Sequence, residues 1–194
     1  MSYTAIYAFG KDGNAFFYGQ IANAWRGAMA IWRTLEERYL PTCVPSWVKA
    51  RYWFRPDMPQ DELIKRIGYK PSRLMSGGDP KDIWELAQNP DVSMTDRIVL
   101  YTTYDKALVK KEDLPKVIDA FRKFDGVSSL PEQAEILEVA YNDPDVFAIG
   151  WDQNSTVADN WGNHGGYDEN RDEGIPYNYL FGEEHFWIFD ELEV

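Results

Sequence analysis

The sequence contains one cysteine, two histidines and no long apolar segment. The lone cysteine, Cys43, excludes an intrachain disulfide and suits a reducing compartment. No segment approaches the roughly 18 uncharged apolar residues that a transmembrane helix needs. The N-terminal residues also lack the basic stretch and apolar run of a secretory signal. These absences together predict a cytoplasmic protein without membrane contact.

Basic residues are nearly missing from the last third of the chain. Residues 125 to 194 contain 17 acidic residues and a single basic one, Arg171, and the whole chain has a net charge of −12. Only residues 49 to 73 show the opposite bias, with 7 basic and 3 acidic residues. A negative field of this kind repels nucleic acid and attracts basic protein surfaces, and it also favours solubility. Direct nucleic-acid binding is therefore not expected, whereas a basic protein partner is.

The composition is typical of a folded globular chain. A chain of 194 residues that is 44% hydrophobic and 15% aromatic fits one domain with a full core. Its 8 tryptophans are a high number for this length. Because tryptophan combines a large apolar surface with one N–H group, it serves both in cores and at binding surfaces. We expect residues 1–194 to form a single domain that uses its tryptophans in both ways.

The N-terminal pattern predicts a β-hairpin followed by a helix. Two runs rich in aromatic and β-branched residues, 3–10 and 15–21, flank an Asp-Gly turn, which is a strong hairpin signal. Asn23 is expected to cap a helix that ends before Pro41, with Glu36 outside its apolar face. The predicted apolar face consists of Trp25, Met29, Trp32, Leu35 and Tyr39.

The rest of the sequence predicts helices and strands in mixed order. Helices are predicted at 59–68, at 79–88 with Asp79 as N-cap, at 110–124 and at 128–141, and strands at 97–104, 145–151 and 184–192. Ser129 and Glu132 have the spacing of a capping box at the start of helix 128–141. Five strands and about five helices in mixed order predict an α+β fold. Its expected core is a single mixed or antiparallel sheet packed by helices on one face.

A long polar and acidic loop is predicted at residues 150–178. Its alternating Asp and Asn residues suggest calcium ligands, but the two EF-hand registers, from Asp152 and Asp168, lack the glycine at the sixth position and the acid at the twelfth. His164 and His185 lack the short spacing of a zinc site. Cys43 lies between two prolines and shows no nucleophile motif. We therefore predict no catalytic residue, no metal site and no cofactor.

The same loop has the composition of a recognition surface. Asn and Gly residues let a loop hold a hydrogen-bonded shape with few apolar contacts, and Trp151 and Trp161 would stand in it as rigid anchors. The candidate binding residues are Trp151, Asp152, Asn154, Asp159, Trp161, His164, Tyr167 and His185.

Three functions remain open at this stage. The charge imbalance favours a non-catalytic, intracellular acidic protein, of a binding or inhibitor type, that engages a basic protein surface through its C-terminal third. The alternative is a small-molecule-binding protein or hydrolase whose pocket lies between the 150–178 loop and the C-terminal strand. A third reading is an assembly subunit whose Trp-rich surfaces are buried in an oligomer. Sequence does not determine the oligomeric state.

Overall fold

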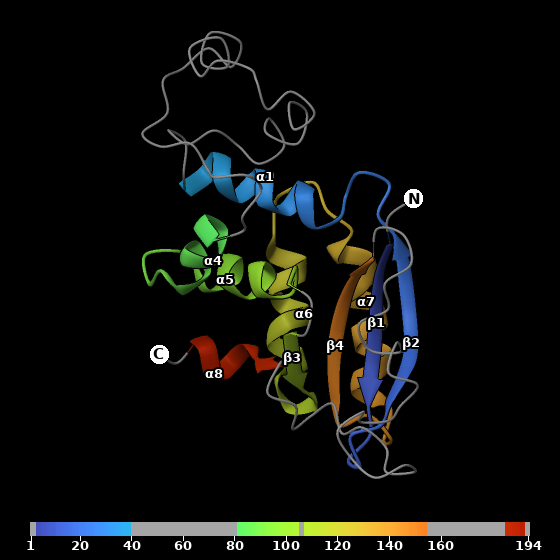
Figure 1. Cartoon of the computed structure of the whole chain (residues 1–194). Helices are drawn as coiled ribbons and strands as arrows, with labels where there is room; N and C mark the ends of the chain where they lie inside the picture. Colours follow the sequence, from blue (N-terminus) through green and yellow to red (C-terminus); the bar gives the residue numbers. More distant parts are fainter. Residues whose placement is uncertain (1–2, 40–80, 105–106, 155–184, 193–194) are drawn as a thin grey trace, which may run out of the picture.

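A mixed sheet of five strands, in the order β2-β1-β4-β3-β5, forms the centre of the structure. The computed structural model describes residues 3–39, 81–104, 107–154 and 185–192 (Figure 1). The strands are β1 (Tyr3–Phe9), β2 (Ala15–Ala22), β3 (Ala107–Lys110), β4 (Ala148–Asn154) and β5 (Phe186–Trp187). Neighbouring strands are antiparallel except β3 and β5, which are parallel. The predicted α+β class with one mixed sheet is confirmed.

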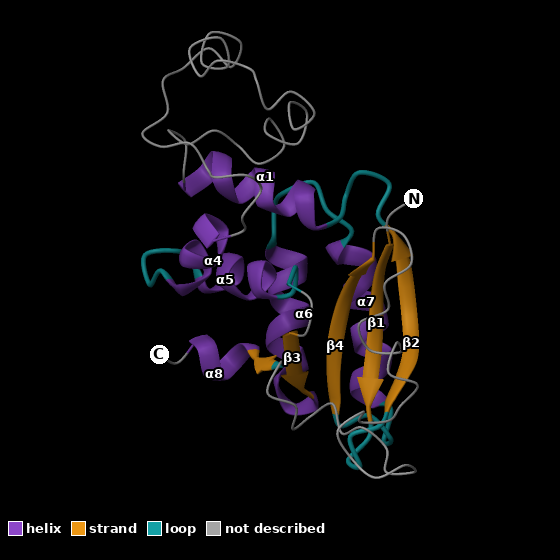
Figure 2. Ribbon diagram, in the orientation of Figure 1, coloured by secondary structure: helices purple, strands orange, loops and turns teal. Residues whose placement is uncertain are grey.

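The helices pack against one face of this sheet (Figure 2). They are α1 (Ala28–Tyr39), α4 (Lys81–Gln88), α5 (Met94–Tyr101), α6 (Leu114–Lys123), α7 (Leu130–Asn142) and α8 (Ile188–Leu192), with a 3-10 turn η1 (Lys111–Asp113) before α6. The main core lies between the helices and alternate sheet residues such as Ile6 and Ile149. The intervening sheet residues, among them Tyr7 and Phe9, form a smaller cluster on the opposite face. Among the described helices, none is both long and apolar enough to cross a membrane.

The N-terminal hairpin is confirmed. β1 and β2 pair antiparallel around a turn in which Gly13, at φ 82°, donates to the carbonyl oxygen of Gly10 at 2.9 Å. The pairing shifts by one residue beyond Ile6, because Gly19 faces Ile6 and Phe17 faces the next residue, Tyr7. Tyr18 is therefore the extra residue of a β-bulge. Among the described strands β2 is the first of the sheet, so one of its sides forms the outer edge of the described sheet (Figure 1).

The predicted helices 110–124 and 128–141 are confirmed, but the capping box is wrong. α6 buries Leu114, Val117, Ile118 and Phe121, which recur at spacings of three and four along one face of the helix. At the start of α7, the Ser129 side chain makes no capping bond and instead accepts a hydrogen bond from Gln133 Nε2 at 3.1 Å. Glu132 pairs with Arg26. A side-chain contact one turn along α7 and an ion pair with Arg26 thus replace the reciprocal capping contacts expected from the spacing.

The strand predicted at 97–104 is wrong, because this segment is helix α5. Ser93 caps the helix, its Oγ accepting from the backbone N of Asp96 at 3.1 Å. Every residue from Asp96 to Tyr101 is buried. A segment buried on all sides has no polar face, so its apolar run fits a strand and a helix equally well. The strand itself, β3, begins three residues later than the predicted segment ends.

The helix predicted from Asn23 begins later than expected. Ala24 and Trp25 have positive φ angles of 43° and 71°, which no helix contains, and α1 starts at Ala28. As a result Trp25 leaves the predicted apolar face. Glu36, which was predicted to lie outside that face, is buried within α1. Asn23 is buried too and accepts from Thr4 Oγ1 at 2.9 Å rather than capping a helix.

Two further predictions change at the C-terminal end. The polar loop does not begin at residue 150, because residues 150–154 complete strand β4. The predicted strand 184–192 is a strand only at Phe186–Trp187 and continues as helix α8. The predicted helix 59–68 and the Asp79 cap lie outside the described residues, as do residues 155–184 of the predicted loop.

Candidate functional site

The structure describes four of the eight predicted binding residues. Trp151, Asp152 and Asn154 belong to β4, and His185 directly precedes β5. The remaining candidates lie outside the described residues: Asp159, Trp161, His164 and Tyr167. Strand β3 stands between β4 and β5, so the backbones that carry Asp152 and His185 are about 10 Å apart. The two residues thus lie on strands that are separated by one intervening strand.

Trp151 is a core residue and not the surface anchor that was expected. Its side chain is fully buried, and its ring packs edge-on against Phe121 with centroids 6.2 Å apart. Its Nε1 donates to Gln133 Oε1 at 3.2 Å. Because Trp151 pairs with Ile6 in the middle of the sheet, it points into the helix side, where α6 and α7 cover it.

Among the tryptophans whose side chains the structure describes, Trp25 is the exposed one. Its side chain is 96% exposed, and its φ of 71° lies in the left-handed region that disfavours a residue with a side chain. The turn that holds it is well packed: Arg26 N donates to Asn23 O at 2.6 Å, and a Cβ on Gly27 would stand 2.6 Å from Asn23 Cγ. The chain therefore keeps a large apolar side chain in water on a strained backbone. Strain of this kind is found most often at functional sites.

Helix α7 flanks the outer strand β2. Ile136 contacts the backbone of β2, because a Cβ on Gly19 would lie 3.2 Å from Ile136 Cδ1. Val139 follows at a spacing of three on the same side of the helix and is 64% exposed. Glu135, next to Ile136, is exposed as well. This side of α7 thus combines apolar and acidic groups beside the edge of the sheet.

A second contact fixes the far end of α7 to β2. The Tyr18 hydroxyl donates to Asp143 Oδ2 at 3.3 Å. Burial, together with the negative charge of Asp143, raises the pKa of Tyr18 above its ordinary value, so the hydroxyl stays protonated and continues to donate. Phe16 packs beside the Tyr18 ring and is 39% exposed, and Phe17 on the other side of the strand is 56% exposed.

We call the residues along β2, the turn after it and the neighbouring side of α7 the β2–α7 edge. Trp25 belongs to it because its neighbour Arg26 pairs with Glu132 in the first turn of α7. The β2–α7 edge consists of Phe16, Phe17, Trp25, Glu135, Ile136 and Val139. Sequence reasoning missed it. The available signals were the Asn-to-Gly spacing around Trp25, which marks a turn, and the absence of any charge in residues 15–22.

Part of the acidic excess is neutralised within the fold. Residues 125–154 contain seven acidic residues and no basic one: Asp125, Glu132, Glu135, Glu138, Asp143, Asp145 and Asp152. Three of these pair with arginines from earlier in the chain: Asp125 with Arg38, Glu132 with Arg26, and Glu138 with Arg122. The hydrogen bond from Arg26 lowers the pKa of Glu132. Glu135 and Asp145 are exposed and take part in none of these pairs, so they carry the field at the surface.

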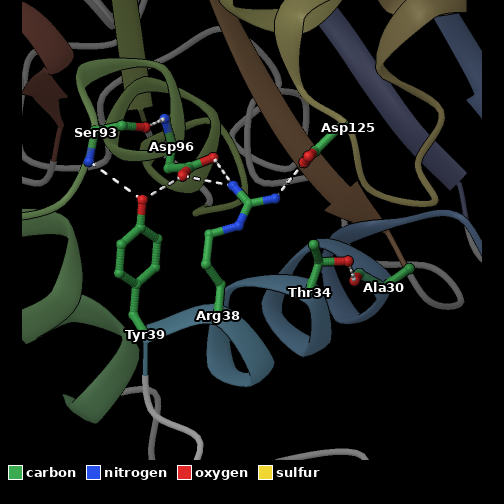
Figure 3. Close-up of polar contacts among 7 residues, drawn as sticks. All are labelled: Ala30, Thr34, Arg38, Tyr39, Ser93, Asp96 and Asp125. Atoms are coloured by element: carbon green, nitrogen blue, oxygen red, sulfur yellow. Dashed lines mark hydrogen bonds and ion pairs between the residues drawn. The ribbon is translucent and has the colours of Figure 1, made fainter.

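A buried carboxylate joins three elements on the helix side (Figure 3). The oxygens of Asp96 accept from Arg38 Nη1 at 2.6 and 2.8 Å and from the Tyr39 hydroxyl at 2.6 Å. Ser93 N donates to the same hydroxyl at 3.3 Å, and Arg38 Nη2 donates to Asp125. Asp96 is 2% exposed. Its accepting positions are occupied by protein donors, so we interpret the network as structural.

A cavity of about 790 Å³ lies at the end of the sheet where β4 begins. It is lined by Lys11, Lys110, Lys111, Glu112, Tyr141, Asn142, Pro144, Val146 and Phe147. Two of its lysines already make structural contacts: Lys111 Nζ donates to the carbonyl oxygen of Asp143 at the end of α7, and Lys110 Nζ lies 5.6 Å from the Trp187 ring centre. The cavity contains none of the predicted site residues.

Comparison with known proteins does not assign the chain to a family. No protein-family model matches it, and neither a curated protein nor a solved structure shows significant similarity. Within the part of the chain that the structure describes, no three His, Cys, Asp or Glu side chains gather in a way that could hold a metal ion. The β2–α7 edge is the candidate site because it combines exposed apolar and acidic side chains.

Proposed function

We propose that the protein is a non-catalytic, cytoplasmic binding protein that engages a basic protein surface through its acidic C-terminal third. The observation that supports this most directly is the side of α7 beside β2, where exposed Val139 lies next to exposed Glu135. Acidic groups around an apolar centre are the composition of a protein-binding surface, because the apolar centre supplies affinity and the charged rim selects the partner.

Trp25 strengthens the proposal. Tryptophan is enriched among the residues that contribute most to protein–protein affinity, and one that is 96% exposed buries a large apolar surface when a partner covers it. A partner protein that carries a lysine- or arginine-rich surface would also be drawn to the 17 acidic residues in residues 125–194. An inhibitor that covers a basic functional site of its partner is included in this class.

The alternative, a small-molecule-binding protein or hydrolase, has less support. The predicted pocket between the 150–178 loop and the C-terminal strand involves residues outside the described part of the chain. The cavity near Lys111 is at the opposite end of β4, and Lys111 itself is held by the carbonyl oxygen of Asp143. We therefore place this function second.

The test uses a fluorescently labelled octalysine peptide as a defined basic probe. Binding is measured by anisotropy at about 50 and about 500 mM salt, since screening weakens exposed charge contacts over this range. The double variant Glu135→Gln, Asp145→Asn should weaken binding by about tenfold at low salt, whereas Glu37→Gln, Asp91→Asn, which removes the same charge elsewhere, should weaken it much less.

Two results would contradict the proposal. If the two double variants lost affinity equally, the probe would be responding to net charge and not to the α7 surface. If binding were absent, or insensitive to salt, an acidic recognition surface would be excluded as the basis of function.

A further inference from the structure

Within the part of the chain that the structure describes, β2 is an edge strand, and it has neither the charged side chains nor the prolines that usually keep such a strand unpaired. Its eight residues, Ala15–Ala22, include no charged residue and no proline. Edge strands in natural proteins are commonly protected by lysines, prolines, bulges or a covering element, since a row of free N–H and C=O groups can pair with another chain. Here the bulge at Tyr18 interrupts the strand, and it leaves Gly19–Ala22 as a regular segment after it.

Apolar side chains lie on the helix side of Gly19–Ala22 and in the turn that follows it. On the helix side lie Ile136, which touches Gly19, and Val139 beyond it. Past the end of β2 stands Trp25, whose position is held by the packed turn from Asn23 to Gly27. A strand laid along the edge would therefore bury exposed apolar side chains as well as form backbone hydrogen bonds.

The acidic side chains beside the edge favour binding of a segment that contains basic residues. Glu135 is exposed on α7 beside Ile136, which contacts Gly19, and Asp143 is bound to Tyr18 of β2 itself. A second copy of the chain would bring a further net charge of −12 against the same surface, which disfavours self-pairing. An extended segment with lysine or arginine at alternate positions meets no such repulsion.

We propose that the outer edge of β2 at Gly19–Ala22 adds a strand from the basic partner, seated between Trp25 and the exposed side of α7. This inference rests on the proposed function, because it describes how the same acidic surface would bind its partner. Main-chain hydrogen bonds to β2 hold the segment in place, Val139 and Trp25 contact its apolar side chains, and the acidic residues contact its basic ones.

The experiment compares two peptides of equal charge and of the length of β2. One alternates valine and lysine; in the other, two of the valines are replaced by proline, which cannot complete a strand ladder. Affinity is measured by anisotropy, and backbone amide exchange of Gly19–Ala22 is followed by NMR. We expect the proline peptide to bind about tenfold more weakly, and only the first peptide to slow exchange of the outward-facing amides in this segment.

A matched pair of variants tests the edge itself. The backbone N–H groups of successive residues point to opposite sides of a strand. One of the two variants Gln20→Pro and Ile21→Pro therefore removes an N–H that points outward, and the other removes a hydrogen bond to β1. The variant whose circular dichroism spectrum stays native should no longer bind the valine–lysine peptide, and it should keep its affinity for octalysine.

The outcomes separate the two proposals. Equal affinity for both strand peptides, without added protection in β2, would overturn strand addition and leave the acidic surface in place. Failure of octalysine and of both strand peptides to bind would overturn both. A concentration-dependent dimer in which the same amides become protected would show that a second copy, and not a basic partner, occupies the edge.

Discussion

At the scale of single residues, two tryptophans differ from their predicted burial in opposite directions. Trp151 was expected at the surface and is fully buried, while Trp25 was expected on the apolar face of a helix and is 96% exposed. Residue type alone does not distinguish the two, because tryptophan is common both in cores and at interfaces. The difference comes from backbone: Trp151 points inward from a central strand, and Trp25 follows a residue with positive φ in a turn.

Trp25 provides a prediction in which stability and binding change in opposite directions. Trp25→Gly should raise the free energy of unfolding by about 1 kcal/mol, because glycine adopts a φ of 71° without steric cost. The same change should weaken octalysine or valine–lysine binding by about tenfold, since the exposed ring is lost. Urea unfolding and anisotropy measure the two effects.

Trp25→Ala is the control for that prediction. It removes the ring and keeps the strained backbone, so it should weaken binding without raising stability. Unchanged binding in both variants would remove Trp25 from the interaction surface.

At the scale of elements, the contacts between helices decide which local patterns are realised. α5 is a helix although its residues suit a strand, and the Asp96 carboxylate explains part of its placement. The Asp96 carboxylate accepts hydrogen bonds from Arg38 and Tyr39 and so links α5 to the end of α1. Arg38 also pairs with Asp125 in the connection between α6 and α7 (Figure 3). A single buried acid thus sets the position of one helix against two other parts of the chain.

Asp96→Asn should lower the free energy of unfolding by about 3 kcal/mol, measured by urea or thermal denaturation. The amide cannot accept from Arg38 and Tyr39 as the carboxylate does, and a partly buried guanidinium loses its main partner. The matched control is Glu37→Gln, which breaks the exposed pair with Arg33 and should cost no more than about 0.5 kcal/mol. Similar losses in the two variants would show that the Asp96 network does not stabilise the fold.

At the scale of the whole molecule, charge has two opposed effects. A net charge of −12 destabilises the compact state through self-repulsion, and the same field attracts a basic partner. The internal pairs of Arg26, Arg38 and Arg122 reduce the repulsion within residues 125–154. The acidic residues outside those pairs account for the attraction, so the two effects have different structural origins.

Raising the salt concentration at pH 7 should therefore increase thermal stability and decrease binding of the basic peptides. Screening weakens both the self-repulsion of the folded chain and its attraction for lysine side chains. Thermal unfolding with and without about 500 mM sodium chloride, alongside anisotropy in the same buffers, checks both signs. A fall in the melting temperature with added salt would show that internal ion pairs outweigh the repulsion.

Much of the fold could be predicted because its signals are local. The hairpin follows from an Asp-Gly turn between two apolar runs, and α6 and α7 follow from apolar residues at helical spacing. The α+β class and the acidic character of the last third also follow from sequence alone. These features depend on residues that are close together in the chain, where turn chemistry and periodicity act directly.

Tertiary structure alone decided the rest. α5 is buried on every side, so its packing against α1 and α6 acts together with the Ser93 cap to select the helix. The β2–α7 edge joins residues more than a hundred positions apart, such as Gly19 and Ile136, and exists only because the sheet places β2 outermost. Likewise, which acids remain at the surface depends on which arginines the fold brings to them. Such pairings are set by the relative positions of whole elements, which no local pattern encodes.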